Sequence, residues 1–146
     1  MRSVTLSELV DYSSKAQLIS NDSVMCGKCN IKTPHSLKRE YNPDMLLIEI
    51  VRVTELKSGW NKNNCIINFP VTNLALPGFS RLYRVVATCD HRGSLTDGHW
   101  LTKICTSGGG WYEINDLKET SLVTRSPGID DSSVVVILLI AEDKLS

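Results

Sequence analysis

From residue 43 onwards, short apolar segments of strand length alternate with short turns, and this pattern restricts the chain to a mainly β fold. Residues 82–89 and 134–140 are rich in β-branched side chains and are too short for an average helix, so each predicts a strand. The glycine-rich stretch at residues 107–110 lies between two alternating segments, which is typical of a hairpin turn. Connections this short suit antiparallel neighbours, so we predict a mainly antiparallel sheet for residues 43–146.

One helix is predicted ahead of the β-rich part, over residues 3–19. Its apolar side chains recur at helical spacing at three positions: Leu6, Leu9 and Val10. Either Thr5 or Ser7 is a suitable N-cap, and Glu8 lies in the first turn, where an acidic side chain is favourable.

The segments between this helix and the clearest strands are more varied. Residues 30–42 mix Lys, Arg and Thr and predict an exposed strand or ribbon. Pro43 then precedes residues 45–53, whose length and β-branched content predict one buried strand. Residues 57–64 are polar and rich in turn-forming side chains, so we predict a loop there, followed by a short strand at residues 65–69.

Composition excludes several function classes. Sixteen basic and sixteen acidic residues give a formal net charge of zero, whereas nucleic-acid and anionic-membrane binders carry a basic surplus. The apolar run at residues 134–141 is too short to span a bilayer, and residues 1–3 lead into a polar segment without the apolar part of a signal peptide. The five cysteines are an odd number, which favours free thiols or metal ligands. We therefore expect an intracellular protein of the cytoplasm or nucleus, with no nucleic-acid or membrane partner.

One pair of polar residues has the chemistry of a catalytic site. His99 follows Gly98 at the edge of a predicted strand, and Asn115 follows an aromatic-rich strand across the predicted hairpin. A cysteine hydrolase needs an imidazole that takes the thiol proton and an acceptor, Asn or Asp, that fixes the imidazole tautomer. Strands about 5 Å apart would bring the two side chains close. The ordinary alternative is a structural histidine beside a turn-forming pair, Asn115 and Asp116.

Cys26 and Cys29 form a CxxC with the spacing of zinc ligands. Tetrahedral zinc needs four ligands, this pair supplies two, and His35 alone would not complete the site. The alternatives are a redox pair, a relic knuckle without metal, or a structural turn. We favour half of a zinc site over a redox pair, because no βαβ pattern accompanies the motif. The predicted hydrolase chemistry itself requires no cofactor.

Cys65 precedes His99 and Asn115 in the order that a Cys-His-Asn site requires, and it is the obvious candidate nucleophile. It lies in a predicted strand, however, whereas reactive thiolates more often lie at helix N-termini, where the helix dipole lowers the thiol pKa. We therefore interpret Cys65 as structural. Cys89 and Cys105 lie within strand patterns and are predicted to be small buried hydrophobic residues.

Taken in order, these segments resemble the C-terminal half of a ubiquitin-specific protease catalytic domain, and the resemblance covers nearly the whole chain. Residues 82–100 are similar to the histidine box of that family, YxLxAVxxHxGxxxxGHY, and residues 111–116 to its WYxFND or WYxFDD motif. Residues 6–12 resemble the helix that leads into the fingers of that family, and residues 26–29 resemble the second CxxC of its fingers zinc ribbon. Residues 43–53 resemble its LPxxLxxxLKRF strand, and residues 69–70 resemble its short FP element.

The resemblance implies an α+β fold of the papain-like cysteine protease type. Residues 1–42 would provide a helix and part of the fingers, and residues 43–146 would form the β-rich palm with the histidine box. It also implies a cysteine-type deubiquitinase that removes ubiquitin from proteins, with ubiquitin or a ubiquitinated protein as its partner.

The resemblance also implies roles for individual residues. His99 would be the general base, Asn115 would orient it, and Asp116 would be a second polar partner. Three residues would flank the channel for the ubiquitin C-terminal tail: Gly98, Trp100 and His91. Trp100 stands where the family usually has tyrosine, which keeps an aromatic wall but loses a hydroxyl group.

In this family the nucleophilic cysteine lies ahead of the first CxxC, so the resemblance implies that the base and its orienting residue are present and the nucleophile is not. Cys65 does not match it, because it falls between the LPxxLxxxLKRF-like strand and the FP element. We therefore expect a fragment, or a chain that is inactive alone. The alternatives are a catalytically silent module that binds ubiquitin or another protein, and a β-rich interaction domain without a link to ubiquitin.

Overall fold

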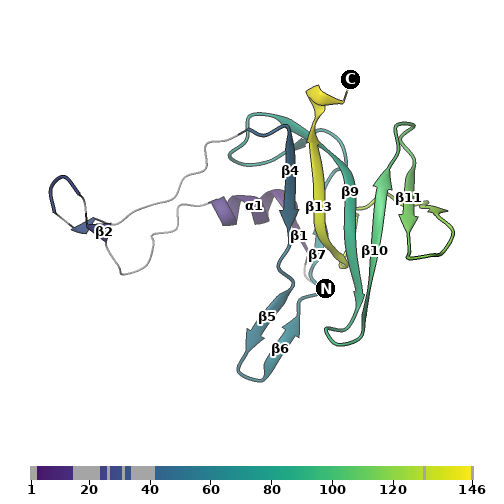
Figure 1. The fold of residues 1–146 in the computed structure, drawn as a ribbon, viewed down its shortest axis with the longest axis horizontal. Coiled ribbons are helices and arrows are strands. Elements are labelled where there is room, and N and C mark those ends of the chain that lie inside the picture. The colour runs from purple at the N-terminus through teal and green to yellow at the C-terminus, as the bar shows by residue number, and fades with distance from the viewer. Residues whose placement is uncertain are drawn as a thin grey trace.

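A computed structural model of the chain describes residues 3–14, 24–25, 27–30, 32–33, 42–129 and 131–145. Within these residues it has one α-helix, α1 (Leu6–Ser14), and a 3₁₀ turn, η1 (Glu142–Lys144). The strands, shown with the helix in Figure 1, are β1 (Ser3–Thr5), β2 (Val24–Met25), β3 (Lys32–Thr33), β4 (Met45–Glu49), β5 (Val53–Leu56), β6 (Gly59–Lys62), β7 (Ile66–Asn68), β8 (Leu74–Ala75), β9 (Leu82–Gly93), β10 (Gly98–Cys105), β11 (Trp111–Ile114), β12 (Ser121–Leu122) and β13 (Val134–Ala141).

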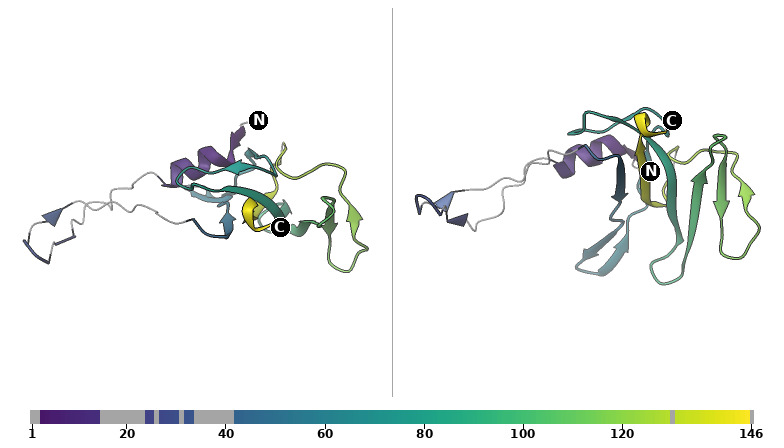
Figure 2. Two further views of the ribbon diagram at one scale, coloured as in Figure 1. Left: turned by 90° about the horizontal axis from the view of Figure 1, so that it is seen from above. Right: turned by 45° about the horizontal axis from the view of Figure 1, so that its top comes forward.

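One sheet dominates the fold. Its strands follow the order β12-β11-β10-β9-β13-β4, and β8 joins β9 outside this path. All of its pairings are antiparallel, which confirms the predicted mainly antiparallel sheet and, with α1, the α+β class. The β5–β6 and β2–β3 hairpins are separate, and Figures 1 and 2 show the latter lying away from the sheet. No helix of the described residues is long and apolar enough to cross a membrane.

The predicted start of the helix over residues 3–19 is wrong, because Ser3–Thr5 forms the strand β1. This segment pairs in parallel with Ile66–Asn68 of β7, a long-range contact that local helical spacing does not reveal. The helix itself is confirmed as α1, and residues 15–19 lie outside the described residues.

A capping box determines where α1 begins. Thr5 Oγ1 accepts a hydrogen bond from Glu8 N at 3.2 Å, and Glu8 Oε2 accepts one from Thr5 N at 2.7 Å. The two bonds satisfy main-chain donors that the first turn of a helix leaves unpaired. Of the two candidate caps, Thr5 is therefore the one used, while Ser7 Oγ donates to Ala75 O at 3.0 Å and so ties α1 to β8.

The buried strand predicted over residues 45–53 is two strands rather than one. β4 lies at the end of the sheet order and is exposed on alternate residues, as an edge strand is, and β5 is exposed throughout. Between them the Arg52 side chain turns inward, and it donates from Nε to Val134 O at 2.6 Å and from Nη1 to Cys65 O at 2.8 Å. The apolar run is therefore interrupted at a buried guanidinium that binds main-chain carbonyls.

The loop predicted at residues 57–64 contains a strand, β6, which pairs with β5 in a hairpin. Gly59 has a φ of 114°, a value that favours glycine and allows the tight turn. The short strand predicted over residues 65–69 is confirmed as β7. β3 lies in the segment predicted as a ribbon and pairs with β2, while residues 34–41 lie outside the described part of the chain.

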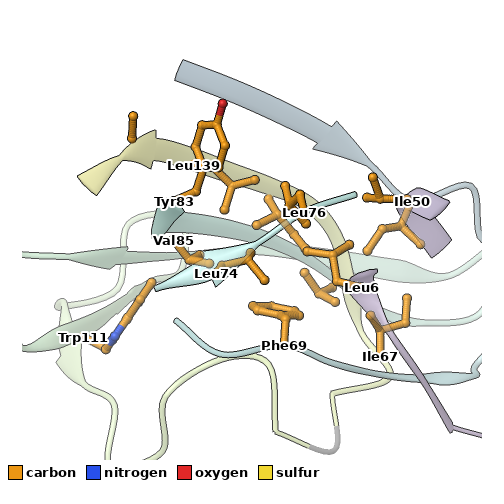
Figure 3. Close-up of a cluster of buried hydrophobic side chains, with 14 residues drawn as sticks. Leu6, Ile50, Ile67, Phe69, Leu74, Leu76, Tyr83, Val85, Trp111 and Leu139 are labelled. Atoms are coloured by element: carbon orange, nitrogen blue, oxygen red, sulfur yellow. The ribbon is translucent and has the colours of Figure 1, made fainter. Parts of the chain in front are cut away.

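The hydrophobic core lies between α1, the segment around β7 and one face of the sheet. The central strands of the sheet contribute buried apolar side chains to this core, namely Tyr83 and Val85 from β9 and Val134, Ile137, Leu139 and Ala141 from β13. Figure 3 shows the central members: Leu6, Ile50, Ile67, Phe69, Leu74, Leu76, Tyr83, Val85, Trp111 and Leu139. The core therefore joins the helix to the strands that carry the polar pair considered below.

Phe69 is held in this core by a close approach to Gly128. Phe69 N donates to Gly128 O at 2.9 Å. A Cβ on Gly128 would lie 2.4 Å from Phe69 O and 2.6 Å from its ring carbon Cδ2, and Gly128 has a φ of 85°. Both the contact and the backbone conformation therefore require glycine at this position.

The core-facing side of the sheet becomes polar at one end. The Lys103 ammonium forms ion pairs with Asp90 and, at 3.5 Å, with Asp131. Lys103 and Asp90 are buried, and Asp131 is partly buried. Ser133 Oγ donates to Asp131 at 2.8 Å. Although burial opposes ionisation of Asp131, hydrogen bonds from Ser133 and Val134 and the charge of Lys103 outweigh it and lower the pKa of Asp131. The network thus holds a cation between two carboxylates.

Candidate functional site

His99 lies near the start of β10, opposite Arg92 of β9. Because side chains alternate between the two faces of a strand, His99 shares its face with Leu101 and Lys103, and Trp100 lies on the other face. Leu101 and Lys103 are buried, whereas the His99 side chain is 50% exposed. His99 is therefore the point at which the core-facing side of β10 reaches solvent.

Asn115 follows the last residue of β11, Ile114, which pairs with Thr102 of β10. Continuing this register puts Asn115 on the same face as His99, as a diagonal neighbour on the adjacent strand. His99 Nε2 lies 2.7 Å from Asn115 Oδ1, which is hydrogen-bonding distance. Lys118 N donates to Asn115 O at 3.0 Å, so a turn fixes the backbone directly after the strand.

Asp116 lies beside this pair. Its Oδ2 is 3.7 Å from His99 Nε2, and its side chain is exposed. Its φ of 51° is in the left-handed region, which Asp and Asn enter more readily than most residues and which turns the chain away from β11. Asn115 is therefore the direct hydrogen-bond partner of His99, and Asp116 adds negative charge at longer range.

The bond to Asn115 determines which nitrogen of the His99 ring carries the proton. An amide oxygen only accepts, so Nε2–H donates to Asn115 Oδ1. In the neutral ring Nδ1 then has a free lone pair, and it has no hydrogen-bond partner among the described residues. A half-exposed imidazole of this tautomer can accept a proton at Nδ1 from a group that approaches from solvent.

On β9 and β10, the sheet face opposite to that of His99 carries a pair of aromatic rings. His91 and Trp100 are cross-strand neighbours whose ring centroids lie 4.7 Å apart at an interplanar angle of 49°. Burial and the nearby charge of Lys62 lower the pKa of His91, which favours its neutral form near pH 7. Both rings and Leu95 line a cavity of about 430 Å³.

Gly98 allows the His91 ring to lie against the loop that connects β9 and β10. A Cβ on Gly98 would lie 2.0 Å from His91 Nε2 and 2.8 Å from Ser94 O. At the other end of the loop Gly93 has a φ of 97°, and Ser94 N donates to Asp97 O at 3.2 Å. The glycines that frame the loop are therefore needed for its closure.

Replacing Gly98 with alanine is expected to displace the His91 ring, because the new Cβ would overlap its Nε2. The overpacking should cost about 1–3 kcal/mol and separate the ring from Trp100. The measurement is the NMR shift of the His91 ring protons, which lie in the ring current of the indole. Gly108→Ala is the control, because the nearest atom to its new Cβ is 4.0 Å away. Unchanged His91 signals in Gly98→Ala would contradict the expected displacement.

Lys62 is a residue of this region that sequence reasoning missed. Its Nζ donates to His91 O at 2.8 Å and to Gly93 O at 2.7 Å. It lies within the segment predicted as a loop, and a lysine in a polar stretch carries no signal for such a contact. The contact becomes visible only once the β5–β6 hairpin has been placed beside the end of β9.

The structure describes one of the two predicted zinc ligands. Cys29 lies exposed in the turn between β2 and β3, whereas Cys26 and His35 lie outside the described residues. Among the residues that are described, no group of three or more His, Cys, Asp or Glu side chains could hold a metal ion. Zinc binding through Cys26 and Cys29 therefore stays a prediction.

Three further cysteines lie in the sheet region. Cys65 directly precedes β7, and its thiol donates to Ile66 O at 3.6 Å. The sequence predicts that Cys89 and Cys105 are small buried hydrophobic residues, but both are only half-buried. Cys89 lies on the sheet face that turns away from the core, because its neighbour Asp90 points inward, and Cys105 packs at the margin of the core.

The sequence of this chain is similar to that of known proteins. The family model described as ubiquitin carboxyl-terminal hydrolase matches residues 11–137. Human ubiquitin carboxyl-terminal hydrolase 21 is 24% identical over 139 residues, which cover 90% of this chain and 24% of that protein. Ubiquitin carboxyl-terminal hydrolase 8 of Saccharomyces cerevisiae is 24% identical over 137 residues, which cover 80% of this chain and 29% of that protein. The chain thus spans about a quarter of the length of these relatives.

Solved structures share the fold. The SAGA DUB module with Ubp8, Sgf11, Sus1 and Sgf73, bound to monoubiquitin, matches with a TM-score of 0.73 at 21% identity, over 94% of this chain and 32% of that chain. The module bound to ubiquitin aldehyde matches with a TM-score of 0.70, over 94% of this chain and 33% of that chain. With a family model that extends over most of its length, the chain that carries His99 and Asn115 belongs to the ubiquitin carboxyl-terminal hydrolase family.

Proposed function

We propose that this chain provides the general base and its orienting residue to a thiol-dependent hydrolase that removes ubiquitin from proteins. One observation carries this proposal: His99 Nε2 and Asn115 Oδ1 are 2.7 Å apart, and the ring is half exposed with Nδ1 available. In this scheme Asn115 holds the tautomer of His99, and Asp116 stabilises the imidazolium at longer range. Family membership supports the reaction class.

The proposed reaction uses Nδ1 of His99. A cysteine thiol that faces this atom gives it a proton, and the thiolate sulfur forms a bond to the isopeptide carbonyl carbon. The imidazolium then gives the proton to the leaving lysine amine as the C–N bond breaks. Water attacks the thioester with the same nitrogen as base, which releases the ubiquitin carboxylate and restores the thiol. In this scheme the thiol is not that of Cys65, which contacts the carbonyl of Ile66 beside β7.

Ubiquitin is the proposed partner. Solved modules that share this fold are described with monoubiquitin or ubiquitin aldehyde bound. On this chain, Trp100 and His91 line a cavity beside the β9–β10 pair, and Gly98 allows the His91 ring to pack against the loop that leads to His99. An aromatic wall of this kind suits an extended peptide tail.

The partner is tested by titrating the ¹⁵N-labelled chain with ubiquitin and with ubiquitin that lacks its C-terminal tail. We expect shifts centred on residues 93–100 with intact ubiquitin and much smaller shifts with the truncated form. Trp100→Ala should weaken binding by about 2 kcal/mol, the size of a hot-spot residue, because the indole is 53% exposed at the cavity. Tyr12→Ala, another exposed aromatic residue, is the control. Equal weakening by the two variants would contradict this binding site.

A ubiquitin probe with a C-terminal electrophile tests the chemistry. The 146-residue chain is reacted with the probe, and any adduct is mapped by mass spectrometry. An adduct at Cys65 would show that its assignment as structural is wrong. Ubiquitin binding without an adduct favours the alternative, a catalytically silent ubiquitin-binding module. Absence of both would count against the proposed partner.

A further inference from the structure

The end of β9 nearest His99 is not covered by β13 on its outer side. β13 pairs with β9 only as far as Val134 opposite Asp90, and one more hydrogen bond follows, from His91 N to Ser133 O at 2.9 Å. In an antiparallel ladder the N–H and C=O of one residue point to the same neighbour, and alternate residues point the same way. The carbonyls of His91 and Gly93 therefore face an edge that β13 no longer covers.

Lys62 takes the place of the missing strand at this edge. It is the last residue of β6, and its Nζ lies 2.8 Å from His91 O and 2.7 Å from Gly93 O. Bonds from an ammonium group to carbonyl oxygens are charge-assisted and stronger than neutral ones. Burial and the positive charge of Arg52 lower the pKa of Lys62, in agreement with an ammonium that is partly withdrawn from water. One side chain thus satisfies two successive carbonyls of the β9 edge.

The other edge of the same stretch of β9 carries the site. There His91 pairs with Trp100, Arg92 with His99, and Gly93 with Gly98. Arg92 is the cross-strand partner of His99, and the two carbonyls that Lys62 binds belong to its neighbours in the chain, His91 and Gly93. Because the strand is a rigid connector over three residues, a restraint on one edge sets the position of the other.

We propose that Lys62 is a positioning residue, which couples the β5–β6 hairpin to the loop at residues 94–97 and to His99. This role in catalysis rests on the proposed function of His99 as a base, but the mechanical coupling does not. Lys62 also lies between two cavities, of about 750 Å³ and 430 Å³, and lines both. Trp60, two residues away on the same strand, is 67% exposed, so a contact with the hairpin surface would be transmitted through Lys62 to the site.

The test compares Lys62→Met, Lys62→Arg and Lys57→Met in the ubiquitin-free chain. Methionine keeps the length of the lysine side chain but removes the donors, arginine keeps the charge and donors, and Lys57 is an exposed lysine in the turn of the same hairpin. Hydrogen exchange of the amides of residues 93–100 and the ¹⁵N signals of the His99 ring are measured by NMR. The ring signals are the readout that a purely structural role elsewhere would not change.

We expect Lys62→Met to raise the rate of amide exchange at residues 93–100 by about tenfold or more, because a charge-assisted hydrogen bond is lost. The same substitution should shift the His99 ring signals. Lys57→Met should change neither the amide exchange nor the ring signals. Lys62→Arg should stay close to the unsubstituted chain in both measurements. Identical behaviour of Lys62→Met and Lys57→Met would overturn the proposal. So would a uniform rise in exchange over the whole sheet, since it would indicate a general loss of stability. Because no ubiquitin is present, these outcomes are independent of whether the chain binds it.

Discussion

Replacing Lys103 with methionine is expected to lower the free energy of unfolding by about 3–5 kcal/mol, one of the two largest effects we expect for a single substitution. The Lys103 ammonium is paired with Asp90 and Asp131, and the Asp90 side chain is fully buried. Removing the cation leaves two carboxylates close together with little water around them. The measurement is urea unfolding at neutral pH, where both carboxylates are ionised in the unfolded chain.

Two further variants test whether the loss of stability in Lys103→Met comes from unpaired buried charge. Asp90→Asn combined with Lys103→Met removes one of the stranded charges and should recover a large part of the loss. Arg92→Met breaks the 3.0 Å ion pair with Glu113, which links β9 to β11 across β10 and in which the arginine is half exposed. That change should cost no more than about 1 kcal/mol, as is usual for surface pairs. Similar losses in Lys103→Met and Arg92→Met would show that the buried network contributes little.

Gly128→Ala is the second substitution with a large expected effect. A φ of 85° costs an L-residue about 1–2 kcal/mol, and overpacking adds about 1–3 kcal/mol. The overlap cannot be relieved by a side-chain rotation alone, because the new Cβ would lie 2.4 Å from the main-chain oxygen of Phe69. Phe69 is a central core residue, so its displacement should spread to its neighbours. Urea unfolding and the NMR signals of the Phe69 ring measure the effect.

Gly109→Ala is the matched control for this prediction. Gly109 has a φ of 80°, close to that of Gly128, but no atom lies within 4 Å of its new Cβ. Its loss of stability should therefore contain the conformational cost alone. The difference between the two variants isolates the clash with Phe69, and equal losses would mean that the core yields to the added methyl group without cost.

The parts that the sequence predicts correctly are those governed by local chemistry. The hairpin of β10 and β11 follows from alternating side chains and a glycine-rich turn, and this hairpin brings His99 to Asn115. Strand periodicity also assigns the two side chains to one face. The contact itself therefore requires only a register of a few residues, which short turns restrict strongly.

The parts that the sequence did not predict depend on distant partners. Ser3–Thr5 is a strand because β7 lies beside it, and the same three residues have no periodicity that would reveal it. Arg52 interrupts an apolar run because carbonyls of distant segments bind its guanidinium. Lys62 acquires its contacts because β13 ends early, and nothing in the residues near Lys62 records where β13 ends.

The parallel pairing of β1 with β7 has a consequence for the order of folding. The two segments lie far apart in the chain, and closing such a loop carries an entropic cost before any contact compensates for it. The capping box between Thr5 and Glu8, by contrast, needs only a single turn of chain. The start of α1 can therefore form early from local bonds, while the pairing of β1 with β7 follows later, because it requires the long loop between them to close.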